Sequence, residues 1–399
     1  MDLTYTPEDE AFRLEVRAWL GDHLVGEFAE LRGLGGSGKD LEAHDERLAW
    51  DRHLAKHGWT CIGWPVEHGG RGLSLMQQVI FHEEYARADA PVRVNHLGEE
   101  LLGPTLIAFG TPEQQARFLP KIRAVEELWC QGYSEPGAGS DLANVQTKAR
   151  LEGGEWVLDG QKVWTSLAQF ADWIFVIARS EPGSQRHHGL SFLLVPVKQD
   201  GIEIRGIEQL SGGAEFNEVF FTGARTSADL TVGEPGAGWA VAMGLLGFER
   251  GVSTLGQQVR FAREFEAVVA MARANGAIDD PVLRDRLAQS RVALDVMRLN
   301  ALRGLSQLTG GEDSSAGGGA GSIAKLVWAG WHRRLGELAM EVAGPTGLTA
   351  PGAPRDLDEW QRLFLFTRSD TIYGGSDEIQ RNILAERVLG LPREPKGTS

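Results

Sequence analysis

Cysteine is almost absent from this sequence: only Cys61 and Cys130 occur among its 399 residues. Two cysteines cannot build a disulfide framework, so we expect a reducing compartment. Long apolar runs are also missing, and residues 1–20 carry several acidic side chains without the apolar centre of a signal sequence. We therefore expect neither a membrane span nor secretion, and the sequence predicts a cytoplasmic protein.

Basic side chains are also in short supply. The chain has 40 lysines and arginines against 55 aspartates and glutamates, which gives a formal net charge of −15. This excess of negative charge disfavours nucleic acid or an anionic membrane as a partner, and an anionic ligand would need a local cationic patch. The hydrophobic share of 42% is ordinary for a globular protein, and the length predicts several layers or domains.

Helical and strand patterns divide the chain into three parts. Residues 1–128 are predicted to be helical, because Thr6 and Thr111 each place a capping side chain before a proline. Short β-rich runs indicate a small sandwich or barrel over residues 129–234. Helical periodicity returns over residues 235–399. The predicted fold class is therefore α+β, with helical domains on either side of a β domain.

Two glycine-containing segments refine this prediction. Asp159-Gly160 is a typical hairpin signal, so we expect a turn between two strands there. Residues 309–322 are rich in glycine but lack the Gly-Lys-Ser/Thr ending of a phosphate-binding loop. We expect this second segment to be a flexible connection between helices.

Two segments of the β region combine features that suit a flat ligand. Residues 131–141 read QGYSEPGAGSD, a backbone with few bulky side chains that can approach a ligand closely and offer it N–H groups. Residues 160–166 read GQKVWTS, and Trp164 can supply an apolar wall. Taken singly, the first segment also reads as a surface turn and Trp164 as a core residue.

A third segment lies near the C-terminus, where residues 373–381 read YGGSDEIQR. Ser376 is predicted to cap a helix with Asp377 and Glu378 in its first turn, an arrangement that needs no ligand. The adjacent glycines Gly374 and Gly375 follow Tyr373, and they favour a backbone that approaches a ligand closely.

Together the three segments resemble the flavin-binding signatures of the acyl-CoA dehydrogenases, and the order of helices, strands and helices is similar to that family's three-domain layout. The resemblance implies a C-terminal four-helix bundle, FAD as cofactor, an acyl-CoA substrate and an electron-transfer flavoprotein as electron acceptor. It also implies a tetramer or dimer, either homomeric or heteromeric. The residues that it assigns to the flavin are Gln131, Tyr133, Ser134, Gly139, Ser140, Trp164, Ser166, Ser376 and Glu378. Those that it assigns to the substrate are Ser140, Arg250, Tyr373 and Gly374.

The catalytic base is expected away from the commonest position of the family. Many members carry the catalytic glutamate where this sequence has Gly374, which cannot abstract a proton. Other members place it before an arginine in the first long C-terminal helix, and Glu249-Arg250 matches that pattern. Apolar neighbours such as Leu245 would raise the pKa of Glu249 by desolvation, as a base requires. A solvated surface pair is the alternative interpretation, and we predict Glu249 as the base.

Other departures from the family pattern keep different functions open. An Arg-x-x-Phe-Gly segment that contacts a neighbouring subunit's FAD in most members is replaced by residues 273–281, and Glu341 stands where glutamine is common. A non-catalytic partner subunit is therefore one alternative, and an acyl-CoA oxidase or flavin monooxygenase is another. His187-His188 lacks a third ligand by spacing, so we expect no metal site. Cys130 is expected to be a small core residue.

Overall fold

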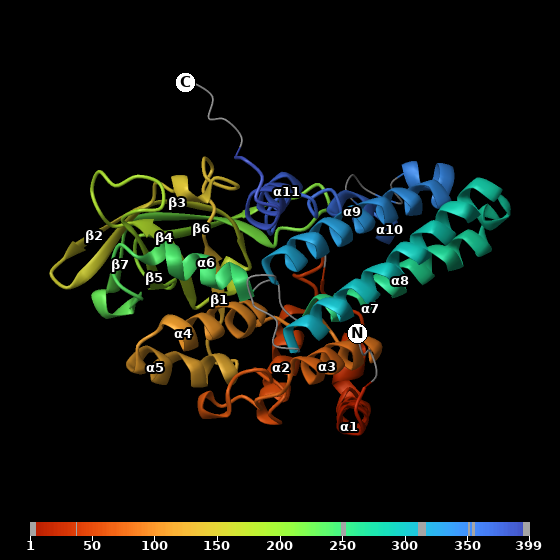
Figure 1. Cartoon of the computed structure of the whole chain (residues 1–399), viewed down its shortest axis with the longest axis horizontal. Coiled ribbons are helices and arrows are strands. Elements are labelled where there is room, and N and C mark those ends of the chain that lie inside the picture. The colour runs from red at the N-terminus through yellow and green to blue at the C-terminus, as the bar shows by residue number, and fades with distance from the viewer. Residues whose placement is uncertain are drawn as a thin grey trace.

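Helices form both ends of the chain and strands form its middle, in the order that the sequence predicts (Figure 1). The computed structural model describes residues 5–36, 38–248, 253–309, 317–349, 352 and 356–393. Among the described helices, none is both long and apolar enough to cross a membrane.

The N-terminal part is a group of helices that begin with side-chain caps. Thr6, Ser74 and Thr111 each accept a hydrogen bond from the backbone of the first helical turn, and each is part of a reciprocal capping box. The indole of Trp50 is fully buried in the apolar core of this part. The α-helices are α1 (Pro7–His23), α2 (His44–Lys56), α3 (Leu75–Arg87), α4 (Gly103–Phe109) and α5 (Pro112–Arg123), with a π-helix, η3 (Leu97–Leu102), before α4 and short 3-10 turns at Gly26–Leu31 and Val66–His68.

The middle part contains one mixed sheet made of its eight described strands. The strand order is β6-β7-β3-β2-β4-β5-β8, and β1 pairs with β4 in parallel. The strands are β1 (Trp129–Gly132), β2 (Lys148–Glu152), β3 (Glu155–Ser166), β4 (Trp173–Arg179), β5 (Leu190–Pro196), β6 (Ile202–Ile207), β7 (Phe216–Ser227) and β8 (Thr231–Val232).

The sheet folds over its own apolar face, as a sandwich does. Leu158 of β3 and Phe221 of β7 belong to the same buried cluster as Ile174 of β4 and Leu193 of β5. The opposite face of β4 and β5 is covered by helices, because Phe175 and Phe192 pack in a second cluster with residues of η3, α4, α5 and α6. The sheet is therefore buried on both sides where the three parts of the chain meet.

The prediction of a hairpin turn at Asp159-Gly160 is wrong. β3 runs through both residues, and its pairing with β7 shifts register between Leu158 and Asp159. Gly160 instead allows the backbone of Thr147 to lie close against β3, because a Cβ atom at Gly160 would lie 2.7 Å from the Cα atom of Thr147. The actual turn between β2 and β3 lies at Gly153 and Gly154, which both have left-handed backbone.

The C-terminal part is a bundle of long helices. Helices α7, α8 and α9 pack on one another, and α10 and α11 pack along α9. The elements are α6 (Gly238–Phe248), α7 (Ser253–Ala274), α8 (Pro281–Thr309), α9 (Gly317–Ala343), α10 (Glu359–Phe366) and α11 (Asp377–Ile383), followed by a π-helical turn at Leu384–Val388, with 3-10 turns at Ala277–Asp279 and Gly344–Leu348.

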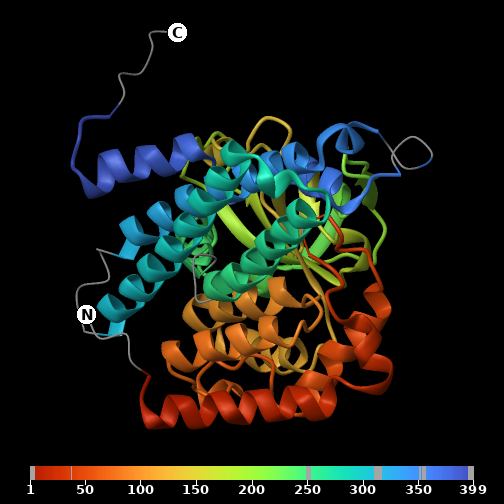
Figure 2. The same ribbon diagram turned by 90° about the vertical axis from the view of Figure 1, so that its right-hand side faces the viewer.

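The expected glycine-rich connection is only partly a connection, because α9 already begins at Gly317 and includes the last glycines of that segment. Residues 310–316 lie outside the described part of the chain. Figure 2 shows α1 along the lower edge of the molecule, and both views place it on the side away from the sheet.

Candidate functional site

The end of β1 and the start of the following loop are tied to β3 by hydrogen bonds. The N–H of Val163 donates to the carbonyl of Ser134 over 2.9 Å, and Lys162 Nζ donates to the carbonyl of Tyr133 over 3.0 Å. Gln131 lies in β1 itself, half-buried, opposite Phe175. The structure thus brings the two β-region segments of the sequence together.

A buried ion pair lies at the base of this loop. Lys162 is fully buried, and its Nζ lies 2.8 Å from Glu135 Oε1. Glu135 also accepts hydrogen bonds from the backbone N–H groups of Gln146 and Thr147. Burial lowers the pKa of Lys162 to about 8, against the opposing effect of Glu135. Burial alone would raise the pKa of Glu135, but Lys162 outweighs it and the pKa lies below its usual value.

Trp164 is held in a conformation that packing alone does not explain. Its side chain is 59% exposed, and its backbone has a φ of 59°, which is costly for a residue with a bulky side chain. The residue lies where the pairing of β3 with β7 shifts register, between Lys162 and Thr165. An exposed indole on strained backbone is typical of a functional position. The alternative interpretation of Trp164 as a core residue is therefore wrong.

The two residues that follow Trp164 both carry hydroxyl groups. Thr165 is fully buried, and its Oγ1 has no hydrogen-bond partner within the described structure. Ser166 is half-buried at the end of β3, opposite Phe216, and Phe216 meets the Trp164 ring edge-on at 6.3 Å. A hydroxyl-bearing strand end therefore adjoins the exposed indole.

The glycine-rich loop leaves this strand end open. Glu135 and Ala138 close a tight turn through two backbone hydrogen bonds, and Gly139 and Ser140 follow it on the surface. A Cβ atom at Gly137 or Gly139 would meet no other atom within 4 Å. The side of the turn forms a hollow of about 310 Å³, lined by Glu135, Pro136, Gly137, Asn144, Gln146, Thr147, Gly160 and Gln161.

The turn between α10 and α11 contains two glycines with left-handed backbone conformation. Gly374 and Gly375 have φ values of 62° and 86°, and the amide of buried Gln380 donates to both of their carbonyls. Ser376 caps α11, as predicted, by accepting from the N–H of Ile379. The side chain of Glu378 is 77% exposed and points to solvent in this chain.

A chain of polar groups, centred on buried His332 and Asp370, supports the same turn. Tyr373 donates from its hydroxyl to Asp370 Oδ1 over 2.8 Å, and Asp370 Oδ2 lies 2.7 Å from His332 Nδ1. The other ring nitrogen of His332 lies 2.8 Å from Glu264 of α7. Burial alone would lower the pKa of His332, but its hydrogen bonds with the two carboxylates outweigh it and raise the pKa to about 9. The turn is thereby connected to α9 and α7.

The predicted base, Glu249, and its neighbour Arg250 lie outside the described residues. The helices on either side of them in the chain are α6 and α7. Leu245 of α6 is fully buried in the cluster shared by the sheet and the N-terminal helices. On α7, a Cβ atom at Gly256 would lie 2.9 Å from Cβ of His82 in α3. Helix α6 therefore packs where the three parts of the chain meet, and α7 packs against α3 of the N-terminal part.

Two departures from the family pattern have local explanations. Glu341 forms an ion pair with Arg286, which joins α9 to α8. Residues 273–281 form the end of α7 and the turn into α8, where Gly276 has a left-handed backbone. Both features stabilise the bundle within this chain.

Comparison with known proteins identifies the family. Three family models match successive parts of the chain: the N-terminal domain of acyl-CoA dehydrogenase at residues 6–126, the middle domain at 130–224 and the C-terminal domain at 236–389. Acyl-CoA dehydrogenase IpdE1 of Mycobacterium tuberculosis (strain ATCC 25618 / H37Rv) is 63% identical over 97% of this chain and 99% of the relative. The chain belongs to the acyl-CoA dehydrogenase family. It is an oxidoreductase of a flavoprotein family, and the α+β prediction is confirmed.

Solved structures of other acyl-CoA dehydrogenases have the same architecture. The structure titled "Tcur3481-Tcur3483 steroid ACAD" superposes with a TM-score of 0.84 at 30% identity, covering 99% of this chain and 100% of that one. The ChsE4-ChsE5 complex from Mycobacterium tuberculosis superposes with a TM-score of 0.80 at 30% identity and the same coverage.

The residues of this acyl-CoA dehydrogenase fit the flavin that its family implies. The exposed indole of Trp164 offers an apolar wall, and Thr165 Oγ1 is a buried polar atom that lacks a partner in the described structure. Sequence reasoning missed the buried Lys162–Glu135 pair and the polar chain through His332. The sequence signal for the pair was a lysine inside an apolar strand pattern. For Glu264, His332 and Asp370, no regular spacing in the sequence indicates that they meet.

Proposed function

We propose that this chain catalyses the FAD-dependent α,β-dehydrogenation of an acyl-CoA thioester, with Glu249 as the base. The observation that carries this proposal is the strained, exposed Trp164 beside a glycine-rich loop, because such a surface suits a tricyclic ring. Gln131, Tyr133, Ser134, Gly139, Ser140 and Ser166 would hold the flavin from the β domain, and Ser376 and Glu378 would hold it from the C-terminal turn.

In the proposed reaction, Glu249 removes a proton from the carbon next to the thioester carbonyl. FAD held by the residues named above would supply the acceptor, at N5, for a hydride from the neighbouring carbon, and an electron-transfer flavoprotein would be the acceptor of the electron pair. The backbone N–H of Gly374 would donate to the thioester carbonyl and stabilise its developing negative charge. Arg250, Ser140 and Tyr373 would contact the substrate. The hydrogen-bonded chain from Tyr373 to His332 and Glu264 would keep the turn in place.

The substrate class that we propose is a CoA thioester of a bulky, steroid-like acyl group. Its support is the likeness to a structure titled as a steroid acyl-CoA dehydrogenase, at 30% identity over nearly the whole of both chains. The competing class is a straight fatty acyl group. A panel of straight, branched and steroid-type thioesters separates the two by their kcat/KM values.

Replacement of Glu249 by glutamine tests the base. We expect Glu249→Gln to retain the flavin spectrum and to lose nearly all turnover, because an amide cannot accept the α-proton. Bleaching of the flavin by substrate without oxygen measures the chemical step directly. The matched control is Glu266→Gln on α7, because Glu266 pairs with Arg291 on the surface. Normal bleaching by the Glu249→Gln protein would remove Glu249 from the mechanism.

A second candidate is that this chain completes a heteromeric enzyme whose base lies in another subunit. Gly374 at the usual base position favours it, as do the structure titled as the ChsE4-ChsE5 complex and the one whose title joins two names, Tcur3481-Tcur3483. Purification of the chain alone distinguishes the alternatives. A yellow protein that bleaches with an acyl-CoA supports the self-sufficient enzyme, and a colourless one supports the partner role. Rapid reoxidation of the reduced flavin by air would instead indicate an acyl-CoA oxidase or a flavin monooxygenase.

A further inference from the structure

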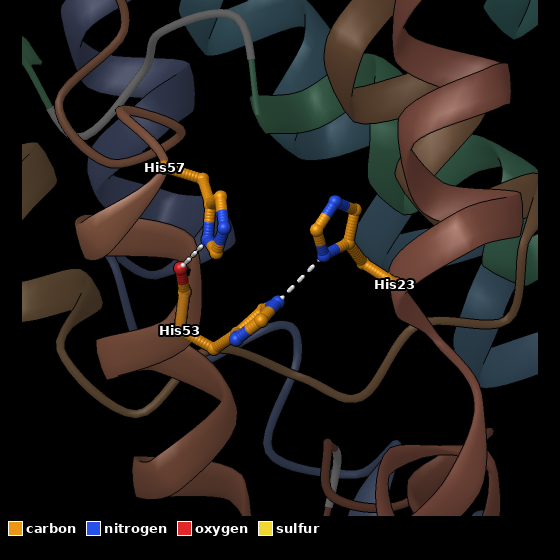
Figure 3. A group of neighbouring side chains, drawn as sticks. All are labelled: His23, His53 and His57. Carbon is orange, nitrogen blue, oxygen red and sulfur yellow. Dashed lines mark hydrogen bonds between the residues drawn. The ribbon is translucent and has the colours of Figure 1, made fainter.

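Three histidines meet at the ends of two N-terminal helices (Figure 3). His23 is the last residue of α1, His53 lies in the last turn of α2, and His57 is the residue that follows α2. One ring nitrogen of each lies within 4.8 Å of the others, and His23 Nδ1 lies 2.9 Å from His53 Nε2. Figure 3 shows the rings of His23 and His57 on either side of His53.

Aromatic side chains hold these rings in position. Trp19 stacks on His23 with ring centroids 4.4 Å apart, and it also contacts the rings of His53 and His57. Trp50 stacks on His53 with ring centroids 5.6 Å apart. The three imidazoles are therefore pre-organised by their surroundings, which lowers the entropy cost of binding one ion between them.

The hydrogen bonding of His57 leaves a ligand atom free. Its Nδ1 lies 2.8 Å from the carbonyl oxygen of His53, which can only accept, so Nδ1 carries the hydrogen. In the neutral tautomer with hydrogen on Nδ1, the other nitrogen, Nε2, offers a lone pair to a metal. A ligating imidazole whose second nitrogen donates to a carbonyl is the usual arrangement in metal sites.

The electrostatics of the cluster also favour a bound cation over protonation of all three rings. Burial lowers the pKa of His53, and so do His57, His23 and Lys56. Both helices direct their C-terminal ends, which carry partial negative charge, toward the histidines. Neutral imidazoles are the form that coordinates metals.

The spacing fits a small tetrahedral ion. With metal–nitrogen distances of about 2.0–2.1 Å, tetrahedral ligand atoms lie roughly 3.4 Å apart. The observed limits of 2.9 Å and 4.8 Å bracket this value, so small side-chain rotations complete the site. His57 is exposed, which leaves room for water as a fourth ligand. A purely structural interpretation, a stack of aromatic rings with a hydrogen bond between His23 and His53, accounts for the ring contacts but does not require a nitrogen of His57 near the other two.

We propose that His23, His53 and His57 bind one divalent ion of the zinc type and so clamp the end of α1 to the end of α2. Three imidazoles suit Zn²⁺, and also Co²⁺, Ni²⁺ and Cu²⁺, over the harder Mg²⁺ and Ca²⁺. The clamp stabilises the N-terminal helices and takes no part in the proposed oxidation. Sequence reasoning missed this site because His23 lies 30 residues before His53; only the His53–His57 spacing of one helical turn was visible.

The test uses the full-length protein without a polyhistidine tag, freed of metal by a chelator. Calorimetric titration with Zn²⁺ should give one equivalent per chain, and Co²⁺ should give the visible absorption bands of a tetrahedral site. We expect His57→Gln to weaken Zn²⁺ binding at least tenfold. The matched control His188→Gln, an exposed histidine outside the cluster, should bind as the parent does.

A second readout is the melting temperature. Zn²⁺ should raise it in the parent and in His188→Gln, because an ion that binds only the folded state stabilises that state. The same addition should leave His57→Gln unchanged, and this variant should fold because the side chain is exposed. Equal Zn²⁺ affinity in His57→Gln and His188→Gln, or binding well below one equivalent by the parent, would overturn the proposal.

Discussion

Replacement of Lys162 by methionine should destabilise the β domain substantially. The ammonium group is fully buried, 2.8 Å from Glu135 and 3.0 Å from the carbonyl of Tyr133. Methionine preserves most of the side-chain volume, so the change removes the charge and leaves little cavity. Glu135 would then be a buried carboxylate without its counter-ion, while it still accepts hydrogen bonds from two backbone N–H groups.

The size of the effect follows from these contacts. Removal of one partner from a buried ion pair costs about 3–5 kcal/mol, and the two remaining hydrogen bonds place this case near the lower end. We therefore expect a loss of about 3 kcal/mol in the free energy of unfolding. At roughly 2–4 °C per kcal/mol, the melting temperature should fall by about 6–12 °C.

Scanning calorimetry measures this fall against a matched control in the same domain. Lys198 is 78% exposed and lies 2.7 Å from Asp172, so Lys198→Met breaks a surface pair and should cost less than about 1 kcal/mol. The double variant Lys162→Met with Glu135→Gln should recover part of the loss, because no unpaired charge remains. Equal melting temperatures for Lys162→Met and Lys198→Met would refute the reasoning.

Two other predictions follow from the site. Because the pKa of His332 is raised to about 9 from an ordinary 6.5, its stabilising contribution of about 3 kcal/mol is complete below pH 6.5 and declines as the pH rises through 9. Thermal unfolding across this pH range should show this loss of stability in the parent but not in His332→Gln. Identical dependence of stability on pH in the two proteins would contradict the prediction. Trp164→Ala should weaken flavin binding about five- to thirtyfold, from a stacking contribution of about 1–2 kcal/mol, with little change in the stability of the flavin-free protein. Fluorescence titration with FAD measures this, and unchanged affinity would exclude the stacking role.

Local signals in the sequence predicted local structure well. The threonines before Pro7 and Pro112 begin helices as expected, because a capping side chain acts within a single turn. Ser376 does the same for α11. The order of helical and strand regions was also predictable, since it depends on periodicities within each segment. Much of the candidate site could be located in this way, because two of its three segments lie in one small domain.

Features that depend on distant neighbours could not be predicted. Asp159-Gly160 has the composition of a hairpin turn, yet Thr147 approaches Gly160 so closely that the glycine serves packing within β3. The partner of Lys162 is 27 residues away in the chain, and the partners of His332 are 38 and 68 residues away. Such contacts arise only when the folded chain brings separate elements together.

The apolar cluster that joins η3, α4 and α5 to β4, β5 and α6 has a consequence for the way this protein can be divided. Sequence similarity separates three modules, but Leu102, Phe175 and Leu245, each fully buried, share one interior. A fragment that ended between any two modules would expose a hydrophobic surface to water and would aggregate. The three modules are therefore expected to depend on one another for solubility when the protein is expressed.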